Sequence, residues 1–327
     1  MADVIPISSQ AETPDSCRGL TASGRRCRNR ATGPDGYCGV HRRARRQAPP
    51  DEDRLGDILS FVRRRLTGQY PIDEFGFDPE LTEKLLAPVA RFFHERWWRV
   101  DWLGLENVPS EGGALLVANH AGTVPWDAIV VQFGVLDRHP AHRHVRLLAA
   151  DLAFKFPFIG ALARKSGSTQ ACAEDAFRLL DKGEVLGVFP EGFKGVGKGF
   201  RQRYKLQRFG RGGFIEIALR ARVPIVPVSI VGSEEIYPMI YDARTVARLF
   251  GFPYFPITPF FPWLGPFGLI PLPSKWLVEF GEPILTDDMP DDAWQDPVTV
   301  FEMTDRVREE IQQTLYRNLT ARRSVFY

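Results

Sequence analysis

Two short segments of the chain carry the residue types that proton transfer and anion binding require. In the first, the apolar run at residues 114–118 leads directly into Asn119 and His120, and Asp127 follows seven positions after the histidine. A neutral imidazole titrates near physiological pH, so His120 can accept the proton of a hydroxyl that attacks a carbonyl. A carboxylate such as Asp127 can fix the tautomer of that imidazole. A histidine after a strand is more often structural than catalytic, so this pair alone does not decide the matter.

The second segment places an acidic residue and several cations in a glycine-rich turn. An apolar run at residues 185–189 enters Phe189-Pro190-Glu191-Gly192, and the cations Lys194, Lys198, Arg201, Arg203 and Lys205 follow. Glycine lets backbone amides approach a bound oxyanion, and lysine or arginine complements its charge. The turn therefore predicts a site for a polar lipid headgroup or for the phosphates of coenzyme A. A solvated basic loop is the alternative.

Both segments need a scaffold that brings strand ends together. Short apolar runs predict strands at residues 114–118, 146–150, 185–189, 224–231 and 276–280. Helical patterns lie between and after them, at 126–133, 173–182, 213–222 and 297–319. This alternation predicts an α/β fold with a central mixed, mostly parallel sheet flanked by helices. In open sheets of this kind, ligands bind at the carboxyl ends of the strands, where both segments would lie.

A helical region precedes this sheet. The sequence predicts a linker with a short helix at residues 54–66, and then a longer amphipathic helix that Asp78 caps and that ends at Trp97 and Trp98. Pro88 should kink that longer helix. Its apolar face would pack on the domain body or lie on a membrane surface. We therefore expect a basic arm at 1–50, a linker and helix at 51–85, and the main domain at 86–327.

The basic arm contains four candidate zinc ligands. Nine arginines stand against four acidic residues in the first 50 positions, although the net charge of the whole chain is only +2. The ligands would be Cys17, Cys27, Cys38 and His41, and the spacing of the last two suits two donors on one ion. A structural zinc at residues 17–41 and an inert, solvated tail are the alternatives. We do not expect nucleic acid as a partner, except through this basic arm.

The longest uncharged stretch of the chain lies near its end. It runs from residue 249 to 274 and contains seven prolines, which disfavour a membrane-spanning helix. Its aromatic residues, including Trp263, would line an acyl-chain groove, sit at the headgroup level of a membrane, or pack in the core. The first ten residues lack the pattern of a secretory signal. We expect a cytoplasmic protein on the cytoplasmic face of a membrane.

Together these blocks resemble the phospholipid/glycerol acyltransferase family, also called lysophospholipid acyltransferases. Three blocks occur in the family's order: Asn119-His120 with a following aspartate, Phe189-Pro190-Glu191-Gly192, and Val223-Pro224-Ile225-Val226-Pro227-Val228. The resemblance spans roughly residues 86–285. No G-x-S-x-G sequence is present, which argues against a hydrolase on a similar scaffold.

The resemblance implies a glycerol-phosphate acyltransferase-like fold that moves a fatty acyl group from acyl-CoA or acyl carrier protein to a glycerolipid or lysophospholipid hydroxyl. It implies no cofactor for catalysis. His120 would be the general base and Asp127 its partner. Residues that would bind substrate are Asn119, Phe189, Pro190, Glu191, Gly192, Lys194 and Arg164. Six residues separate His120 from Asp127, whereas the family pattern has four. A catalytically inactive, lipid-binding relative is therefore the alternative.

Overall fold

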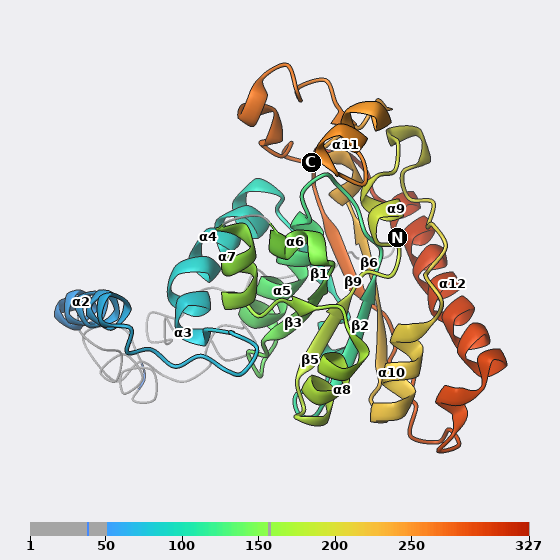
Figure 1. Ribbon diagram of the computed structural model, residues 1–327, viewed down its shortest axis with the longest axis horizontal. Helices are drawn as coiled ribbons and strands as arrows, with labels where there is room; N and C mark the ends of the chain where they lie inside the picture. Colours follow the sequence, from blue (N-terminus) through green and yellow to red (C-terminus); the bar gives the residue numbers. More distant parts are fainter. Residues whose placement is uncertain (1–37, 39–50, 156–157, 327) are drawn as a thin grey trace, which may run out of the picture. The chain divides into compact units, whose positions relative to one another are not determined.

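Seven strands form one mixed sheet at the centre of the main unit (Figure 1). They are β1 (Asp101–Leu103), β2 (Ala114–Ala118), β3 (Val145–Ala149), β4 (Thr169–Gln170), β5 (Val185–Val188), β6 (Ile225–Val231) and β9 (Leu277–Phe280). The order across the sheet is β1-β9-β6-β2-β5-β3-β4. Only the β6–β9 pair of this sheet is antiparallel. This computed structural model describes residues 38, 51–155 and 158–326, and in that part it confirms the predicted mixed, mostly parallel sheet.

Helices cover both faces of the sheet. They include α5 (Trp126–Arg138), α8 (Ala173–Asp181), α10 (Gly213–Ala221) and α12 (Pro297–Ala321). Leu115 and Val117 of β2 belong to one core cluster with residues of α8, α10 and α12, whereas Leu116 and Ala118 belong to another with residues of α5. Successive side chains of a strand point to opposite faces, so the uninterrupted apolar run of β2 fills both cores.

The sequence located most of these elements to within a few residues. The five predicted strands correspond to β2, β3, β5, β6 and β9, and the four predicted helices to α5, α8, α10 and α12. α12 begins where its sequence indicates, because the Asp296 side chain accepts hydrogen bonds from the backbone N–H groups of Val298 and Thr299. Strands β1 and β4 were not predicted, because a strand of three or two residues is too short to show an alternation of apolar and polar residues.

The predicted helix before the sheet is present and continues past Pro88. The segment runs through α3 (Pro79–Leu81), η1 (Thr82–Leu86), α4 (Ala87–Phe92) and η2 (Phe93–Trp97), in which η1 and η2 are π-helical turns. The Asp78 side chain accepts a hydrogen bond from the Leu81 N–H, as predicted for its cap. Pro88 lies in the first turn of α4, directly after the π-helical turn η1.

The two faces of this helical segment differ in their surroundings. Trp98, directly after η2, is completely buried and stacks on Trp276 with ring centroids 4.6 Å apart. Leu85, Val89 and Phe92 are each more than half exposed. The aromatic end therefore packs on the domain body, while an apolar stripe of the helix faces outward.

A long insertion separates β6 from β9. It contains the short antiparallel pair β7 (Tyr241–Asp242) and β8 (Pro256–Ile257), with α11 (Arg244–Phe250) between them, and the 3-10 turn η6 (Gly265–Leu269). This insertion projects at the top of Figure 1. The remaining elements are α6 (Asp151–Lys155), α7 (Ile159–Lys165), α9 (Phe193–Val196) and the 3-10 turns η3 (Leu105–Asn107), η4 (Phe200–Gln202), η5 (Ser233–Glu235) and η7 (Ala293–Gln295).

The chain divides into two compact units, Met1–Tyr70 and Pro71–Tyr327. In the first unit, α2 (Asp51–Thr67) covers the helix predicted at 54–66. The division falls inside the range 51–85 that the sequence assigns to linker and helix. No helix in the described ranges is both long enough and apolar enough to cross a bilayer.

Candidate active site

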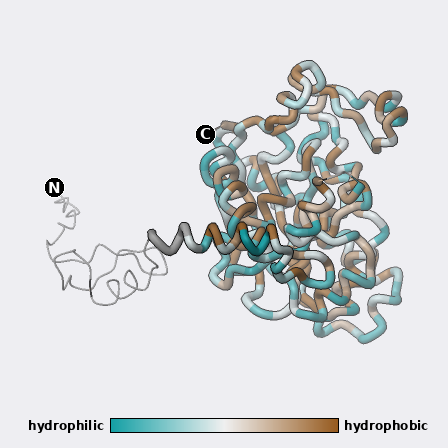
Figure 2. The backbone as a smooth tube through the Cα atoms, turned by 60° about the vertical axis from the view of Figure 1, so that its left-hand side comes forward, coloured by the Kyte–Doolittle hydropathy of each residue, from teal (hydrophilic) through white to brown (hydrophobic). Residues whose placement is uncertain are grey.

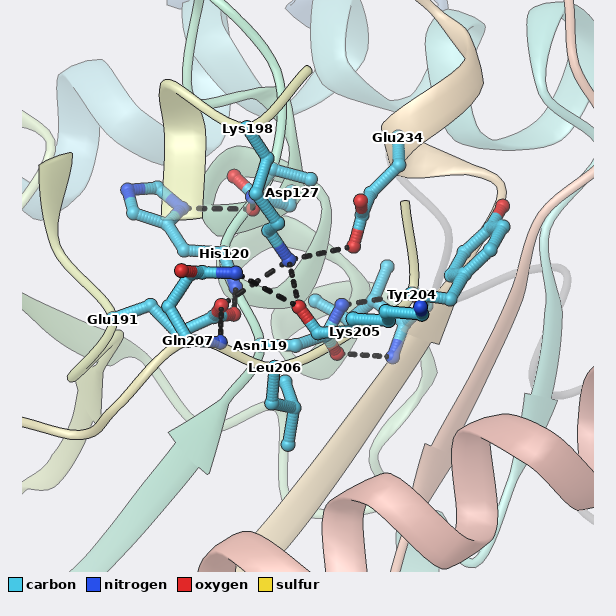
Figure 3. Close-up of polar contacts among 12 residues, drawn as sticks. Asn119, His120, Asp127, Glu191, Lys198, Tyr204, Lys205, Leu206, Gln207 and Glu234 are labelled. Atoms are coloured by element: carbon cyan, nitrogen blue, oxygen red, sulfur yellow. Dashed lines mark hydrogen bonds and ion pairs between the residues drawn. The ribbon is translucent and has the colours of Figure 1, made fainter. Parts of the chain in front are cut away.

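The candidate site lies where three neighbouring parallel strands end. β6, β2 and β5 are adjacent in the sheet, and the segments that follow them carry Glu234, His120 and Glu191. The carboxyl ends of parallel strands meet at one edge, so residues far apart in the sequence become neighbours there. Figure 3 shows their side chains gathered at this edge, together with Lys198 from the loop after β5.

His120 and Asp127 form a hydrogen-bonded pair. His120 Nδ1 lies 2.8 Å from Asp127 Oδ2, and the histidine side chain is 15% exposed. The same Oδ2 accepts the backbone N–H of Ala121 at 2.7 Å, and Oδ1 accepts that of Ala128 at 2.8 Å. The buried carboxylate is thus fixed by three hydrogen bonds. It favours the tautomer with a proton on Nδ1, which leaves Nε2 as a proton acceptor.

The six residues between His120 and Asp127 do not separate the pair. They form a loop over Ala121 to Pro125, and α5 then begins at Trp126, so Asp127 lies in its first turn. The second ring nitrogen of His120 points away from Asp127 in Figure 3. The longer spacing is therefore absorbed in the loop, and His120 and Asp127 are in direct contact.

Glu191 holds the backbone of His120 in place. Its Oε1 accepts the His120 N–H at 2.9 Å, and its Oε2 accepts the N–H of Gln207 at 2.7 Å. The Phe189 ring packs beside the imidazole, with ring centroids 4.7 Å apart. At Gly195 an added Cβ would lie only 2.9 Å from the His120 carbonyl oxygen, so only glycine lets this turn approach the histidine.

A buried ion-pair network lies behind Glu191. The Lys198 ammonium is 3.1 Å from Glu191 Oε2 and 3.0 Å from Glu234 Oε1, and it donates to the Lys205 carbonyl at 3.2 Å. The Lys198 side chain is only 3% exposed. An ammonium has three protons to donate, and three acceptors surround it here. Lys198 is therefore not available to bind a headgroup phosphate, which corrects its assignment to the anion-binding cations.

Glu234 has an unusual protonation equilibrium. Burial raises the pKa of its carboxyl from 4.5 to about 7, although the charge and the hydrogen bond of Lys198 lower it. The nearby charge of Glu191 raises this pKa further. Two carboxylates thus share one ammonium in a buried site, and the second negative charge is only partly compensated.

Other predicted substrate residues have defined neighbours in the structure. Asn119 is fully buried, and its side-chain amide donates to the Ile230 carbonyl at 3.0 Å and accepts the Ile230 N–H at 2.7 Å. It therefore joins the end of β2 to β6. Pro190 accepts the Gly210 N–H through its carbonyl, and Gly192 has a φ of +52°. These contacts describe how the turn is built, and they leave the predicted contacts with substrate as predictions.

The two predicted phosphate-binding cations lie in different places. Lys194 is exposed on α9, directly after the Phe189–Gly192 turn. Arg164 is exposed on α7, where its guanidinium lies 4.6 Å from the centre of the Phe154 ring. Lys194 thus follows the turn that contacts His120. The Arg164 guanidinium instead contacts an aromatic ring.

Sequence reasoning missed Glu234, the link through Gln207 and the role of Lys198. Glu234 follows β6 in the stretch Gly232-Ser233-Glu234-Glu235, so an acidic pair after a buried strand was the available signal. That signal becomes meaningful only when β6 is known to lie beside β2, because the order of strands is not written in the sequence.

The predicted zinc ligands Cys17, Cys27 and His41 lie outside the described residues. Cys38 is described and buried. Within the described ranges, no three histidine, cysteine or carboxylate side chains are grouped as a metal site would require. The zinc module therefore remains a prediction from the sequence.

Two segments of the chain match known family models. Residues 99–231 match the family model described as Acyltransferase. Residues 14–49 match a domain of unknown function, DUF5763. The first match contains the His120–Asp127 pair and the Phe189–Gly192 turn, and it ends at the last residue of β6.

Curated relatives cover most of the chain. An uncharacterized protein of Mycobacterium tuberculosis, Rv0502, is 58% identical over 270 residues, which are 83% of this chain and 75% of that protein. An uncharacterized protein of Mycobacterium leprae, ML2427, is 55% identical over 283 residues, 86% and 77% of the two chains. A bovine "DGAT1/2-independent enzyme synthesizing storage lipids" is 25% identical over 217 residues, covering 66% of this chain and 59% of the enzyme.

One solved structure is also similar. The 1-acyl-sn-glycerophosphate acyltransferase PlsC of Thermotoga maritima is 21% identical and superposes with a TM-score of 0.49. The match covers 76% of this chain and 85% of that protein.

Proposed function

This chain belongs to the acyltransferase family, and we propose that it transfers a fatty acyl group from a thioester donor to a hydroxyl of a glycerolipid or lysophospholipid, with His120 as general base. The observation that carries the proposal is the 2.8 Å contact between His120 Nδ1 and the buried carboxylate of Asp127, with the other ring nitrogen directed away from it. This is the arrangement that a histidine base requires.

The reaction follows from this pair. The acceptor hydroxyl donates its proton to His120 Nε2 while its oxygen attacks the thioester carbonyl, and Asp127 stabilises the imidazolium that forms. When the tetrahedral intermediate collapses, the C–S bond breaks and the imidazolium returns the proton to the departing thiolate. The products are an ester and a free thiol. A single proton thus passes from oxygen to sulfur through one nitrogen, and the scheme requires no covalent enzyme intermediate.

The donor in this proposal is acyl-CoA or acyl carrier protein, and the acceptor is a lipid alcohol. The match to storage-lipid enzymes supports a glycerolipid acceptor, and Lys194 offers an exposed cation for a phosphorylated one. Lys198 is paired with Glu191 and Glu234, so it does not serve as a phosphate-binding cation in this proposal. An acceptor panel that contains both neutral and phosphorylated lipids is therefore required.

We also propose that the protein acts at a membrane surface, on its cytoplasmic face, because a lipid acceptor would reside in a bilayer. Exposed apolar residues on the helical segment and on the insertion support such a position. An inactive, lipid-binding relative was suggested by the long spacing between His120 and Asp127. The direct contact between these residues supports turnover instead.

The test is acceptor-dependent release of free thiol from long-chain acyl-CoA or acyl carrier protein by wild type and His120→Ala. Acceptors are lysophosphatidic acid, other lysolipids, monoacylglycerol and diacylglycerol. Loss of a general base should lower the rate by about 10²-fold or more. His144→Ala serves as the matched control, because that histidine pairs with Glu83 and should leave the rate unchanged.

Full activity of His120→Ala would remove this residue from the mechanism. Thiol release that does not depend on an acceptor would indicate a thioesterase. A wild-type protein that binds lipid but releases no thiol with either donor would establish the inactive alternative.

A further inference from the structure

The insertion between β6 and β9 combines an uncharged sequence with an exposed apolar surface. Residues 249–274 contain no Asp, Glu, Lys or Arg. Trp263 is 72% exposed, Phe267 74% and Ile270 55%. A soluble surface seldom gathers large apolar side chains without charges between them, so this segment has the composition of an interaction site. Figure 2 shows the brown, hydrophobic stretches along the projecting part at the top of the tube.

The exposed residues sit on an ordered support. Thr258 Oγ1 accepts the backbone N–H groups of Phe260 and Phe261, and the Thr258 N–H donates to the Phe261 carbonyl. Gly268 is buried, and a Cβ there would lie 2.7 Å from the Phe260 carbonyl oxygen. Backbone hydrogen bonds and close packing thus fix the turn that presents Trp263 and Phe267. A preformed apolar surface costs little conformational entropy when it binds.

The charges that flank this surface are basic on its N-terminal side. Arg244 and Arg248 lie exposed on α11, and Leu249 and Phe250 follow them directly as exposed apolar residues. Arg244 Nε lies 3.2 Å from Asp242 Oδ2, so the charge of Arg244 is partly balanced. Arg248 is not part of this ion pair and adds a positive charge. Aromatic side chains beside arginines suit the boundary between the acyl chains and the anionic headgroups of a bilayer.

The inner side of the insertion contacts the loop of the candidate base. The Tyr254 hydroxyl donates to the carbonyl of Thr123, which lies between His120 and Asp127. Tyr237 OH accepts from Trp126 Nε1 at 3.0 Å and donates to the Leu269 carbonyl at 2.6 Å. Burial raises the pKa of both phenols, so they act as neutral hydrogen-bonding groups. The exposed apolar turn is therefore hydrogen-bonded to the segment that carries the candidate base and its partner.

We propose that the insertion, through Trp263, Phe267 and the flanking Arg248, is the surface that docks this protein on an anionic lipid bilayer and sets the His120 loop at the membrane boundary. The second half of this statement rests on the proposed function, because it assumes that His120 acts on a lipid hydroxyl. The first half concerns binding alone. A bilayer is favoured over a second copy of the chain because the exposed Arg248 directly precedes the uncharged, apolar segment.

The test uses the full chain and vesicles, and it does not depend on turnover. Wild type, Trp263→Ala/Phe267→Ala, Arg248→Ala and the control Val298→Ala/Phe301→Ala are compared by flotation with phosphatidylcholine vesicles that contain or lack phosphatidylglycerol. Val298 and Phe301 are 62% and 59% exposed on α12, so the control removes similar apolar surface elsewhere. We expect the insertion variant to lose about tenfold or more in affinity and Arg248→Ala about fivefold on anionic vesicles only.

Equal vesicle binding by wild type and the insertion variant would overturn the proposal and would point to another apolar surface, such as Leu85, Val89 and Phe92. A dimer in solution that this variant dissociates would likewise overturn it in favour of a second copy. Thiol release from a water-soluble, short-chain acceptor separates the two proposals. The insertion variant should keep that activity, whereas an inactive wild type that still binds vesicles would refute the proposed function alone.

Discussion

Replacing Lys198 by methionine tests whether the buried network supports the candidate site. Methionine approximates the length of the lysine stem but removes the ammonium that contacts Glu191 and Glu234. Both carboxylates are at most 5% exposed, so solvent cannot replace the lost charge. Breaking a buried pair by removing one partner costs about 3–5 kcal/mol.

The expected loss is large enough to measure by thermal unfolding. For domains of 150–250 residues, each kcal/mol shifts Tm by about 2–4 °C, so Lys198→Met should lower Tm by roughly 6–20 °C. Lys194→Met is the matched control, because Lys194 is exposed on α9, just before Lys198 in the chain, and should change stability by less than about 0.5 kcal/mol.

A second variant separates charge from packing. Lys198→Met/Glu234→Gln leaves only Glu191 charged, and that carboxylate still accepts the N–H groups of His120 and Gln207. We expect the double variant to recover about half of the lost stability or more. If Lys198→Met unfolds at the same temperature as Lys194→Met, the network does not stabilise the site and the reasoning is refuted.

Two further predictions concern neighbouring residues. Glu234 in the folded protein has a pKa of about 7, above its ordinary 4.5, so the folded state holds a proton that the unfolded state has released, and this group destabilises the fold as pH rises from about 5 to above 7. Urea unfolding should therefore show Glu234→Gln gaining stability relative to wild type over that pH range, whereas parallel curves would exclude the raised pKa. Asn119→Ala should cost about 2–4 kcal/mol by the same assay, because it leaves the buried N–H and C=O of Ile230 without their side-chain partners, and a loss below 0.5 kcal/mol would contradict that role.

The local elements were largely predictable. β2 is a five-residue apolar run, and α12 begins at an aspartate followed by proline, so local pattern and capping chemistry marked both. The insertion was predictable only in composition. The seven prolines of its uncharged part, residues 249–274, argued against a spanning helix, but they did not show which aromatic side chains would be exposed.

The candidate site likewise has features that the local sequence predicted and others that it did not. The residues of the two blocks determined that a histidine, an aspartate and a glutamate would follow buried strands, since side-chain chemistry and strand pattern are local properties. The order of strands decided what these residues do to one another. Because β6 and β5 both lie beside β2, Glu191 bonds the backbone of His120, and Glu234 meets Lys198.

The spacing of six residues between His120 and Asp127 shows what the sequence by itself determined and what it left open. The sequence determined which two residues could form the pair, because Asp127 is the only acidic residue between Glu111 and Asp137. Only the tertiary structure decided that they meet, because the conformation of the intervening loop and the start of α5 set the direction of the carboxylate. Likewise, the run of cations indicated an anion site, and burial between two carboxylates decided that Lys198 is not part of it. Charge is a property of the residue, whereas its availability depends on what the fold places around it.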